Sequence, residues 1–241
     1  MTVNGETFTG TLIARDYVLT AGHVAARVPP GNIRFNLNVG GNLTRTISAT
    51  AVFSPPDYKE FNPANPTGDL AIIRLAEPAP AGVPVYHLYQ GALSSGTTLT
   101  LVGYGASGNG DSGVTVGSNP AVKRVGKNTA DILRPSPASG RPAVYYFDFD
   151  GPDLSANVFG DGTLGNTIET SVAGGDSGGP AFIRDRSGHL WLAGVNTFWT
   201  SFNNPRPPGT FGSGGGGVLL SGYAAWIKSV IAAGRVKTPS R

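Results

Sequence analysis

Hydrophobic residues along this chain gather in short runs, and turn-forming residues separate one run from the next. Runs of this length, rich in β-branched and aromatic residues and bounded by Gly, Pro, Asn or Asp, predict β-strands. The predicted strands cover residues 11–20, 33–39, 46–53, 70–75, 97–104, 143–149, 180–183, 190–198 and 217–220. Short strands spread evenly over a chain are typical of β-barrels and β-sandwiches, so we expect an all-β fold.

One segment near the C-terminus follows a helical period instead. Its apolar residues Tyr223, Trp226, Ile227, Val230 and Ile231 are spaced so that they share one face. We therefore predict a C-terminal helix that docks on the rest of the protein by this face.

Two other segments are rich in Gly, Asn, Ser and Pro, which favour turns and interrupt strands. They cover residues 106–120 and 203–216, and we predict a long surface loop for each.

The composition agrees with this pattern. The 241 residues include 36 Gly and 19 Pro, which suit many strands joined by tight turns. A chain of this length forms one large domain or two fused halves.

The formal net charge is +3, from 18 Lys and Arg against 15 Asp and Glu, and there is no basic run or aromatic-interleaved basic stripe. We therefore expect no nucleic-acid partner.

The chain contains no cysteine. This excludes disulfide bonds, a thiolate nucleophile and cysteine-ligated metals. Residues 1–10 lack the basic and apolar regions of a signal peptide, and no apolar stretch of about 18 residues occurs. We expect neither a signal peptide nor a membrane span in this sequence.

The sequence GGDSGGP at residues 174–180 directly precedes a predicted strand. Glycines around Ser177 allow backbone conformations that a Cβ would forbid, and they allow a ligand to come close. Such a loop can direct the N–H groups of Gly175 and Ser177 at one oxygen that becomes negative during acyl transfer. The alternative is a flexible Gly/Ser turn, against which Asp176 and the order of the residues argue.

A serine hydroxyl needs an adjacent base to act as a nucleophile. His23 lies directly after a predicted strand among small residues, which leave its imidazole accessible. His87 and His189 lack such a setting. A buried carboxylate beside the imidazole would hold the useful tautomer, and Asp69 at the start of the strand over residues 70–75 is suited to this role.

These residues lie in the segments TAGH (20–23), GDLAIIRL (68–75) and GGDSGGP, which resemble motifs of the chymotrypsin-like (trypsin-fold) serine peptidases in that family's order. Further likenesses are GTLI at residues 10–13, VGYG at residues 102–105 and YAAWI at residues 223–227. The absence of cysteine is similar to bacterial members of the family. The resemblance covers most of the chain.

The resemblance implies two six-stranded antiparallel β-barrels with a C-terminal α-helix and an active site in the cleft between the barrels. The first barrel would span residues 1–90, with allowance for a truncated first strand, and would carry His23 and Asp69. The second would span residues 91–241 and carry Ser177.

The implied activity is that of a serine endopeptidase. Ser177 would attack the peptide carbonyl, His23 would take its proton, Asp69 would orient His23, and the N–H groups of Gly175 and Ser177 would form the oxyanion hole. The same resemblance implies protein or peptide substrates, no cofactor, no metal site, a monomer, and a secreted or periplasmic location.

One departure from the family concerns Asp176. In members activated from a zymogen, a newly cut N-terminus pairs with the aspartate before the catalytic serine, and residues 1–9 contain no such sequence. Either that segment is missing from this chain or another group stabilises Asp176.

Four residues are expected to set substrate preference. By the resemblance, Ser171 forms the base of the primary specificity pocket, and Thr197, Phe198 and Trp199 form its wall. A neutral base favours neutral, apolar P1 side chains, whereas a shifted loop would bring Glu169 into the pocket.

Two other functions stay open. A non-catalytic trypsin-fold module that binds a partner would be inactive for want of the segment that pairs with Asp176. An esterase or other acyl hydrolase shares the triad chemistry, but its serine comes first in chain order, and here His23 comes first.

A separate acidic segment contains Asp148, Asp150 and Asp153. Several carboxylates so close together could bind Ca²⁺, but the EF-hand spacing fails because Phe159 stands at its last position. We expect a solvated acidic turn there.

Overall fold

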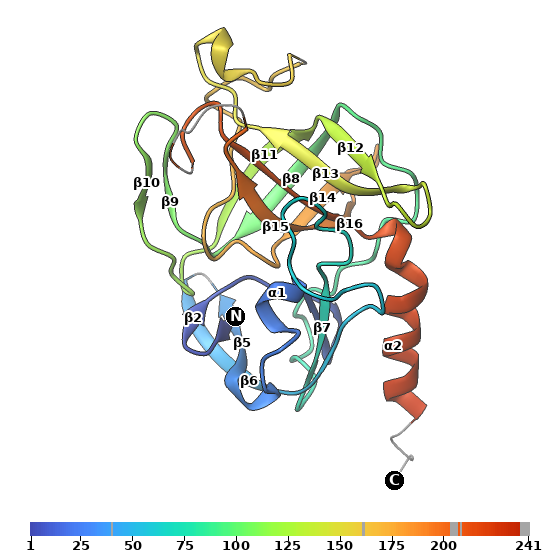
Figure 1. Cartoon of the computed structure of the whole chain (residues 1–241). Helices are drawn as coiled ribbons and strands as arrows, with labels where there is room; N and C mark the ends of the chain where they lie inside the picture. The colour runs from blue at the N-terminus through green and yellow to red at the C-terminus, as the bar shows by residue number, and fades with distance from the viewer. Residues whose placement is uncertain (40, 161, 203–206, 208, 237–241) are drawn as a thin grey trace.

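The computed structural model describes residues 1–39, 41–160, 162–202, 207 and 209–236. Two large antiparallel sheets form the molecule, one from each half of the chain, and a C-terminal helix runs down one side (Figure 1). The predicted all-β fold with a docked C-terminal helix is confirmed.

The first sheet has seven strands in the order β2-β1-β5-β6-β7-β4-β3. Their bounds are β1 (Thr2–Val3), β2 (Glu6–Thr7), β3 (Thr11–Ala14), β4 (Tyr17–Thr20), β5 (Ile33–Val39), β6 (Asn42–Phe53) and β7 (Ala71–Leu75). The long strand β6 pairs with β5 over its first part and with β7 over its last part, with a bulge between Ala49 and Ala51. A bulge bends a strand, so β6 can serve both sides of a curved sheet.

The second sheet also has seven strands, in the order β11-β8-β14-β15-β16-β13-β12. Their bounds are β8 (Thr97–Gly103), β11 (Arg124–Ala130), β12 (Ile132–Pro135), β13 (Pro142–Asp148), β14 (Pro180–Arg184), β15 (Leu190–Thr200) and β16 (Gly214–Leu219). Each sheet therefore has one strand more than the six per barrel that the resemblance implies.

Several details differ from the expected pattern, and four strands were not predicted at all: β1, β2, β11 and β12. The run over residues 11–20 is a hairpin, because the chain turns between β3 and β4. The predicted loop over residues 106–120 contains a hairpin of β9 (Ser107–Asn109) and β10 (Gly113–Val116). The other predicted loop lies partly outside the described residues, at 203–206 and 208, and its last three residues begin β16.

The glycines at the start of β16 are strand residues because neighbouring groups leave no room for side chains. A Cβ on Gly216 would lie 2.2 Å from the carbonyl oxygen of Tyr145, and one on Gly215 would lie 2.8 Å from a methyl of Val172. Close packing, rather than turn formation, explains this glycine run.

One hydrophobic cluster continues from the first sheet into the second. It includes Tyr17, Leu19 and Ile72 from the first sheet and Leu192 and Val218 from the second. The two sheets therefore share a core, and the expected division at residues 90 and 91 stays a prediction.

The C-terminal helix α2 (Ala224–Val236) packs on that cluster by the predicted face: Ile227 is fully buried, and Trp226, Val230 and Ile231 lie against it. Short helical turns complete the fold: α1 (Gly22–Ala25), η1 (Pro30–Asn32), η2 (Leu154–Ala156) and η3 (Ser221–Tyr223). Within the described ranges, no helix has the length and apolar character needed to cross a membrane.

Candidate active site

His23 stands where β4 ends and α1 begins. The preceding residue must be small, because a Cβ on Gly22 would lie 2.9 Å from the Tyr58 ring and 3.0 Å from an oxygen of Asp69. The imidazole also contacts the ring of Phe61, with centroids 5.1 Å apart. The His23 side chain is 24% exposed, so its ring is anchored by its neighbours but open to a ligand.

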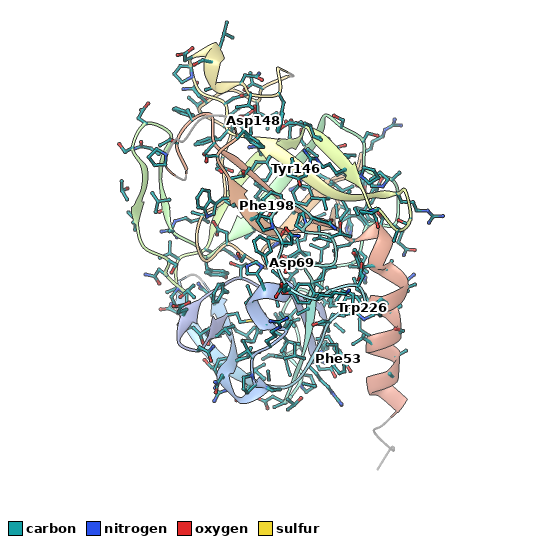
Figure 2. All side chains as sticks on the ribbon, in the orientation of Figure 1. Phe53, Asp69, Tyr146, Asp148, Phe198 and Trp226 are labelled. Atoms are coloured by element: carbon teal, nitrogen blue, oxygen red, sulfur yellow. The ribbon has the colours of Figure 1, made fainter. Side chains whose placement is uncertain are left out.

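Asp69 lies two residues before β7, after a turn in which Gly68 has a φ of +80°. Its side chain is 1% exposed and lies between the two sheets (Figure 2). Both oxygens accept hydrogen bonds from His23: Oδ1 from the backbone N–H at 2.7 Å, and Oδ2 from Nδ1 at 2.8 Å. A carboxylate held in this way keeps the proton on Nδ1 and leaves Nε2 as an acceptor.

Ser177 comes from the second half of the chain, in the loop before β14. Its Oγ lies 3.0 Å from Nε2 of His23, so its hydroxyl can donate to that nitrogen. The structure thus brings Asp69, His23 and Ser177 into one hydrogen-bonded row, although 46 and 154 residues separate them along the chain.

The loop around Ser177 has the backbone shape that its glycines allow. Gly175 has a φ of +97° and Gly178 a φ of +85°, values that favour glycine. The N–H groups of Gly175 and Ser177 donate to no acceptor within the described part of the chain. These two donors are therefore available to an oxygen that is not part of the protein.

Asp176 points away from the row, to the other side of the same loop. Its carboxylate accepts from the N–H of Gly105 at 2.8 Å and from that of Ala173 at 3.0 Å. Burial raises the pKa of Asp176, while these two N–H groups and the positive charge of Arg124 oppose the rise. Internal groups thus stabilise this carboxylate.

The surroundings of Asp176 explain a motif in β8. A Cβ on Gly103 would lie 1.9 Å from Oδ1 of Asp176, and one on Gly105 would lie 2.5 Å from its carboxyl carbon. Arg124 stabilises the backbone at Gly105, because its Nη1 donates to the carbonyl oxygen of Gly105 at 2.8 Å. The two glycines in VGYG thus make room for the carboxylate.

Comparison with known proteins agrees with this geometry. The model of the trypsin family matches residues 1–213. The chain belongs to the trypsin family. Among solved structures, it is similar to neuropsin, a serine protease expressed in the limbic system of mouse brain. The two are 20% identical, with a TM-score of 0.62, over 93% of this chain and 89% of that chain. No curated protein matches the chain.

Membership of the trypsin family confirms the resemblance read from the sequence and assigns the fold. Proteases of this family act on proteins.

The residues expected to form the specificity pocket lie in different surroundings. Thr197 is buried in β15, and its Oγ1 has no partner among the described residues. Phe198 is buried against Tyr146 of β13, with ring centroids 5.2 Å apart. Trp199 is 46% exposed, so its ring does not fill a buried pocket.

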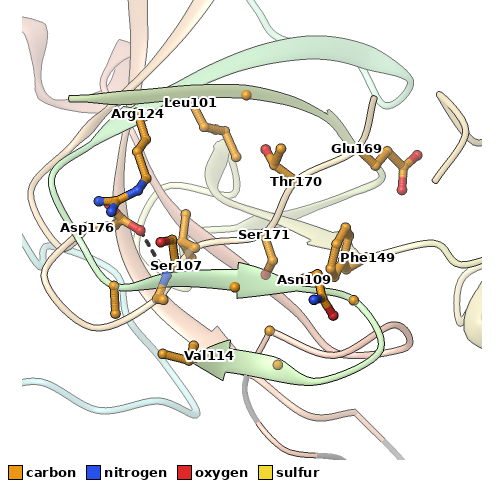
Figure 3. A pocket seen from close by; sticks show the side chains of 18 of the residues that line it. Leu101, Ser107, Asn109, Val114, Arg124, Phe149, Glu169, Thr170, Ser171 and Asp176 are labelled. Atoms are coloured by element: carbon orange, nitrogen blue, oxygen red, sulfur yellow. Dashed lines mark hydrogen bonds between the residues drawn. The ribbon is translucent and has the colours of Figure 1, made fainter. Parts of the chain in front are cut away.

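A cavity of about 700 Å³ lies on the Asp176 side of the loop, between the β9–β10 hairpin and β11 (Figure 3). Ser171, Arg124 and Phe149 are among its lining residues. None of the three residues in the hydrogen-bonded row lines it. The Ser171 hydroxyl oxygen is buried and has no partner in the described part of the chain.

Both carboxylate oxygens of Glu169 accept hydrogen bonds from groups within the protein. Its Oε2 accepts from the N–H of Asp150 at 2.9 Å, and its Oε1 accepts from the Thr163 hydroxyl at 3.0 Å and the Leu164 N–H at 2.7 Å. A carboxylate with three donors stabilises the loop that it closes. Glu169 lines the same cavity as Ser171, but both of its carboxylate oxygens already accept hydrogen bonds within the protein.

The expectation of a solvated acidic turn is wrong for two of its three residues, because Asp148 and Asp150 are buried and only Asp153 is exposed. Oδ2 of Asp148 accepts from the N–H groups of Val158 and Phe159, and Asp153 accepts from Ser155 at the start of η2. Among the described residues, no group of three or more potential ligands could hold a metal ion.

The other two histidines lie apart from the row. His87 and His189 are exposed and flank Trp191, with ring centroids 6.5 Å and 4.8 Å away.

Sequence reasoning did not identify Arg124, Phe61 or Thr9 as neighbours of the site. Arg124 and Phe61 lie in segments without a recognisable motif, and only the fold brings them close. Thr9 directly precedes the GTLI motif, and this position is the one sequence signal that points to Thr9.

Proposed function

We propose that this chain is a serine endopeptidase that cleaves peptide bonds through an acyl-enzyme on Ser177. The observation that carries the proposal is the row of Asp69, His23 and Ser177, with contacts of 2.8 and 3.0 Å. The row is suited to catalysis, because Asp69 at its inner end is buried while the imidazole of His23 in its middle is partly open to solvent.

In the first step, Oγ of Ser177 bonds to the carbonyl carbon of the substrate and its proton moves to Nε2 of His23. The carbonyl oxygen becomes negative and accepts from the N–H groups of Gly175 and Ser177. The buried charge of Asp69 stabilises the imidazolium that forms. Nε2 then gives its proton to the leaving amine as the C–N bond breaks.

In the second step, water gives a proton to Nε2 and bonds to the acyl carbon. A second tetrahedral intermediate uses the same two N–H groups. Its collapse breaks the ester bond to Ser177, and the proton on Nε2 returns to Oγ. No cofactor or metal is needed for this sequence.

A non-catalytic binding module is the alternative. It would require a collapsed oxyanion loop for want of the segment that pairs with Asp176. Asp176 instead accepts hydrogen bonds from the N–H groups of Gly105 and Ala173, with Arg124 nearby. The N–H groups of Gly175 and Ser177 stay available to a substrate. These observations favour the enzyme.

For substrate preference, we propose cleavage after neutral, apolar P1 residues. Ser171 is uncharged, and the two nearest acids in sequence, Glu169 and Asp176, are both held by hydrogen bonds within the protein. Neither of these two carboxylates is therefore free to select Lys or Arg. Thr197 and Phe198, both buried, would form the wall of this pocket, and Trp199, which is 46% exposed, would lie at its open edge. We further propose a monomer that acts outside the cytoplasm, on the basis of family membership.

The proposal can be tested by digestion of casein and of a peptide library with equal amounts of Leu, Phe, Ala, Lys and Asp at P1. The parent protein should cleave casein and prefer apolar P1 residues, and Ser177→Ala should be inactive with an unchanged circular dichroism spectrum. An inactive but folded parent would favour the binding module. Preference for Lys would contradict only the assignment of a neutral pocket.

A further inference from the structure

Thr9, which precedes β3 in the first half of the chain, contacts the loop that holds Ser177. Thr9 is 1% exposed. Its backbone N–H donates to the carbonyl oxygen of Ser177 at 3.1 Å, and its Oγ1 donates to the carbonyl oxygen of Gly175 at 2.9 Å. A single residue thus binds the loop at two points.

The direction of the Thr9 hydroxyl is fixed by its other partner. Oγ1 accepts from the backbone N–H of Tyr104 at 3.1 Å, so its own proton is directed to Gly175. The carbonyl oxygen of Thr9 accepts from the Thr20 hydroxyl at 2.9 Å. Every polar group of Thr9 is therefore in use, and Thr20 supports it from β4.

The two carbonyl groups held by Thr9 alternate with the two free N–H groups along the loop. The peptide between Gly175 and Asp176 is held at both ends, because its N–H donates to Ala173. The peptide after Ser177 is also held at both ends, because the N–H of Gly178 donates to Asn196. The free N–H groups of Gly175 and Ser177 belong to the peptides immediately before these two.

The loop also fits closely on Thr9. A Cβ on Gly178 would lie 2.2 Å from the carbonyl oxygen of Thr9 and 2.0 Å from Oγ1 of Thr20. A Cβ on Gly175 would meet Thr7, Gly105 and Ser118, each at 3.0 Å. The loop therefore has little room to shift while the Thr9 contacts persist.

We propose that Thr9 is a positioning residue for the oxyanion hole: its hydroxyl fixes the Gly175 peptide so that the N–H groups of Gly175 and Ser177 converge on one point. This inference rests on the proposed function, because it assigns the orientation of that same site to a side chain from the other half of the chain. Donors act on a developing oxyanion only when they are aimed at it beforehand.

The test compares three variants with the parent. Thr9→Val keeps the shape of the side chain but removes the hydroxyl, and Thr9→Ser keeps the hydroxyl. Thr11→Val is the matched control, because Thr11 lies two residues further on, is 5% exposed, and has a buried hydroxyl without a partner among the described residues.

For Thr9→Val we expect a fall in kcat of about 10-fold to 100-fold with KM nearly unchanged, since misplaced groups lower the rate by factors of this order. The inhibition constant of a peptide boronate, which mimics the oxyanion, should rise by a similar factor. Thr9→Ser should recover most of the loss, and Thr11→Val should match the parent. Thermal melting of each variant shows whether it is folded.

Equal kinetics for Thr9→Val and Thr11→Val would overturn the inference. So would a Thr9→Ser variant as impaired as Thr9→Val, because a hydroxyl at this position would then not restore the activity. Both results require an active parent. An inactive parent would instead count against the proposed function, so the two failures are distinguishable.

Discussion

His23 donates to both carboxylate oxygens of Asp69, through its backbone N–H at 2.7 Å and through Nδ1 at 2.8 Å. The backbone bond fixes where the carboxylate lies relative to the start of α1, and the side-chain bond fixes the imidazole ring. Asp69 therefore sets both the orientation and the tautomer of His23.

The first prediction is that Asp69→Asn lowers kcat by about 10⁴-fold, the loss known for this change in the archetypal Ser–His–Asp triad. The amide cannot accept from both donors and favours the wrong tautomer. Steady-state kinetics on a peptide substrate will measure the effect. Glu77→Gln, the same change of carboxylate to amide at an exposed site, is the control and should keep parental activity. A loss below tenfold in Asp69→Asn would contradict the assigned role.

The second prediction concerns Arg124, whose positive charge lowers the pKa of Asp176 against the effect of burial. Arg124→Met should lower kcat/KM roughly tenfold, the factor that corresponds to about 1.4 kcal/mol. The pH at which activity is half lost on the acid side should also rise. Lys123→Met removes an exposed charge from the neighbouring position and should change neither quantity. Identical profiles for the two variants would refute the role of Arg124.

The third prediction follows from the raised pKa of Asp176, which burial causes. The native state holds this proton more tightly than the unfolded chain does. The contribution of Asp176 to the free energy of unfolding therefore falls as pH rises from the ordinary pKa of 3.8 through the raised one.

Asp176→Asn removes this titration, so its stability relative to the parent should increase across that pH range and then level off. Urea unfolding of both proteins from about pH 3 to about pH 7 will show the trend. A relative stability that decreases with rising pH would mean that the pKa of Asp176 is lowered instead.

The fourth prediction uses two tyrosines. The Tyr223 hydroxyl donates to Oδ2 of Asp57 at 2.8 Å and fastens the start of α2 to the loop before Asp69. Burial and the bond to Asp57 raise the pKa of Tyr223 well above its usual range. Tyr223→Phe should lower the free energy of unfolding by about 1.5–3 kcal/mol, as expected for a hydrogen bond to a charged group.

Tyr17→Phe is the matched control, because the Tyr17 hydroxyl is buried without a partner in the described ranges. Its removal should leave stability unchanged or slightly higher. Urea unfolding of the two variants measures the difference. Equal stability of the variants would show that the bond to Asp57 contributes nothing.

The sequence was most informative where one short segment combines small residues, which allow an unusual backbone conformation, with a reactive side chain. His23, Asp69 and Ser177 could be identified because each lies in a motif that joins a strand to a small-residue turn. Most of the central strands were predictable from short apolar runs bounded by turn-forming residues. The glycine run at the start of β16 was not, since its meaning depends on Tyr145 and Val172 across the sheet.

Partners distant in sequence could not be predicted either. The GTLI motif after Thr9 marks its strand but does not indicate that Gly175 lies beside Thr9, and nothing around Arg124 indicates that Asp176 lies beside it, because these contacts exist only once the sheets have formed. The role of Glu169 also depends on contacts that the sequence does not show. It was considered as a group that could reach the specificity pocket, but its three hydrogen-bond donors place it in a structural role.

The most direct test of the central claim is labelling with a fluorophosphonate, followed by intact mass measurement and peptide mapping. Our account predicts one adduct per folded molecule, located on Ser177, and none on Ser177→Ala or on the urea-unfolded parent. A folded parent that takes up no label, or takes it up on another serine, would contradict the assignment of Ser177 as an activated nucleophile.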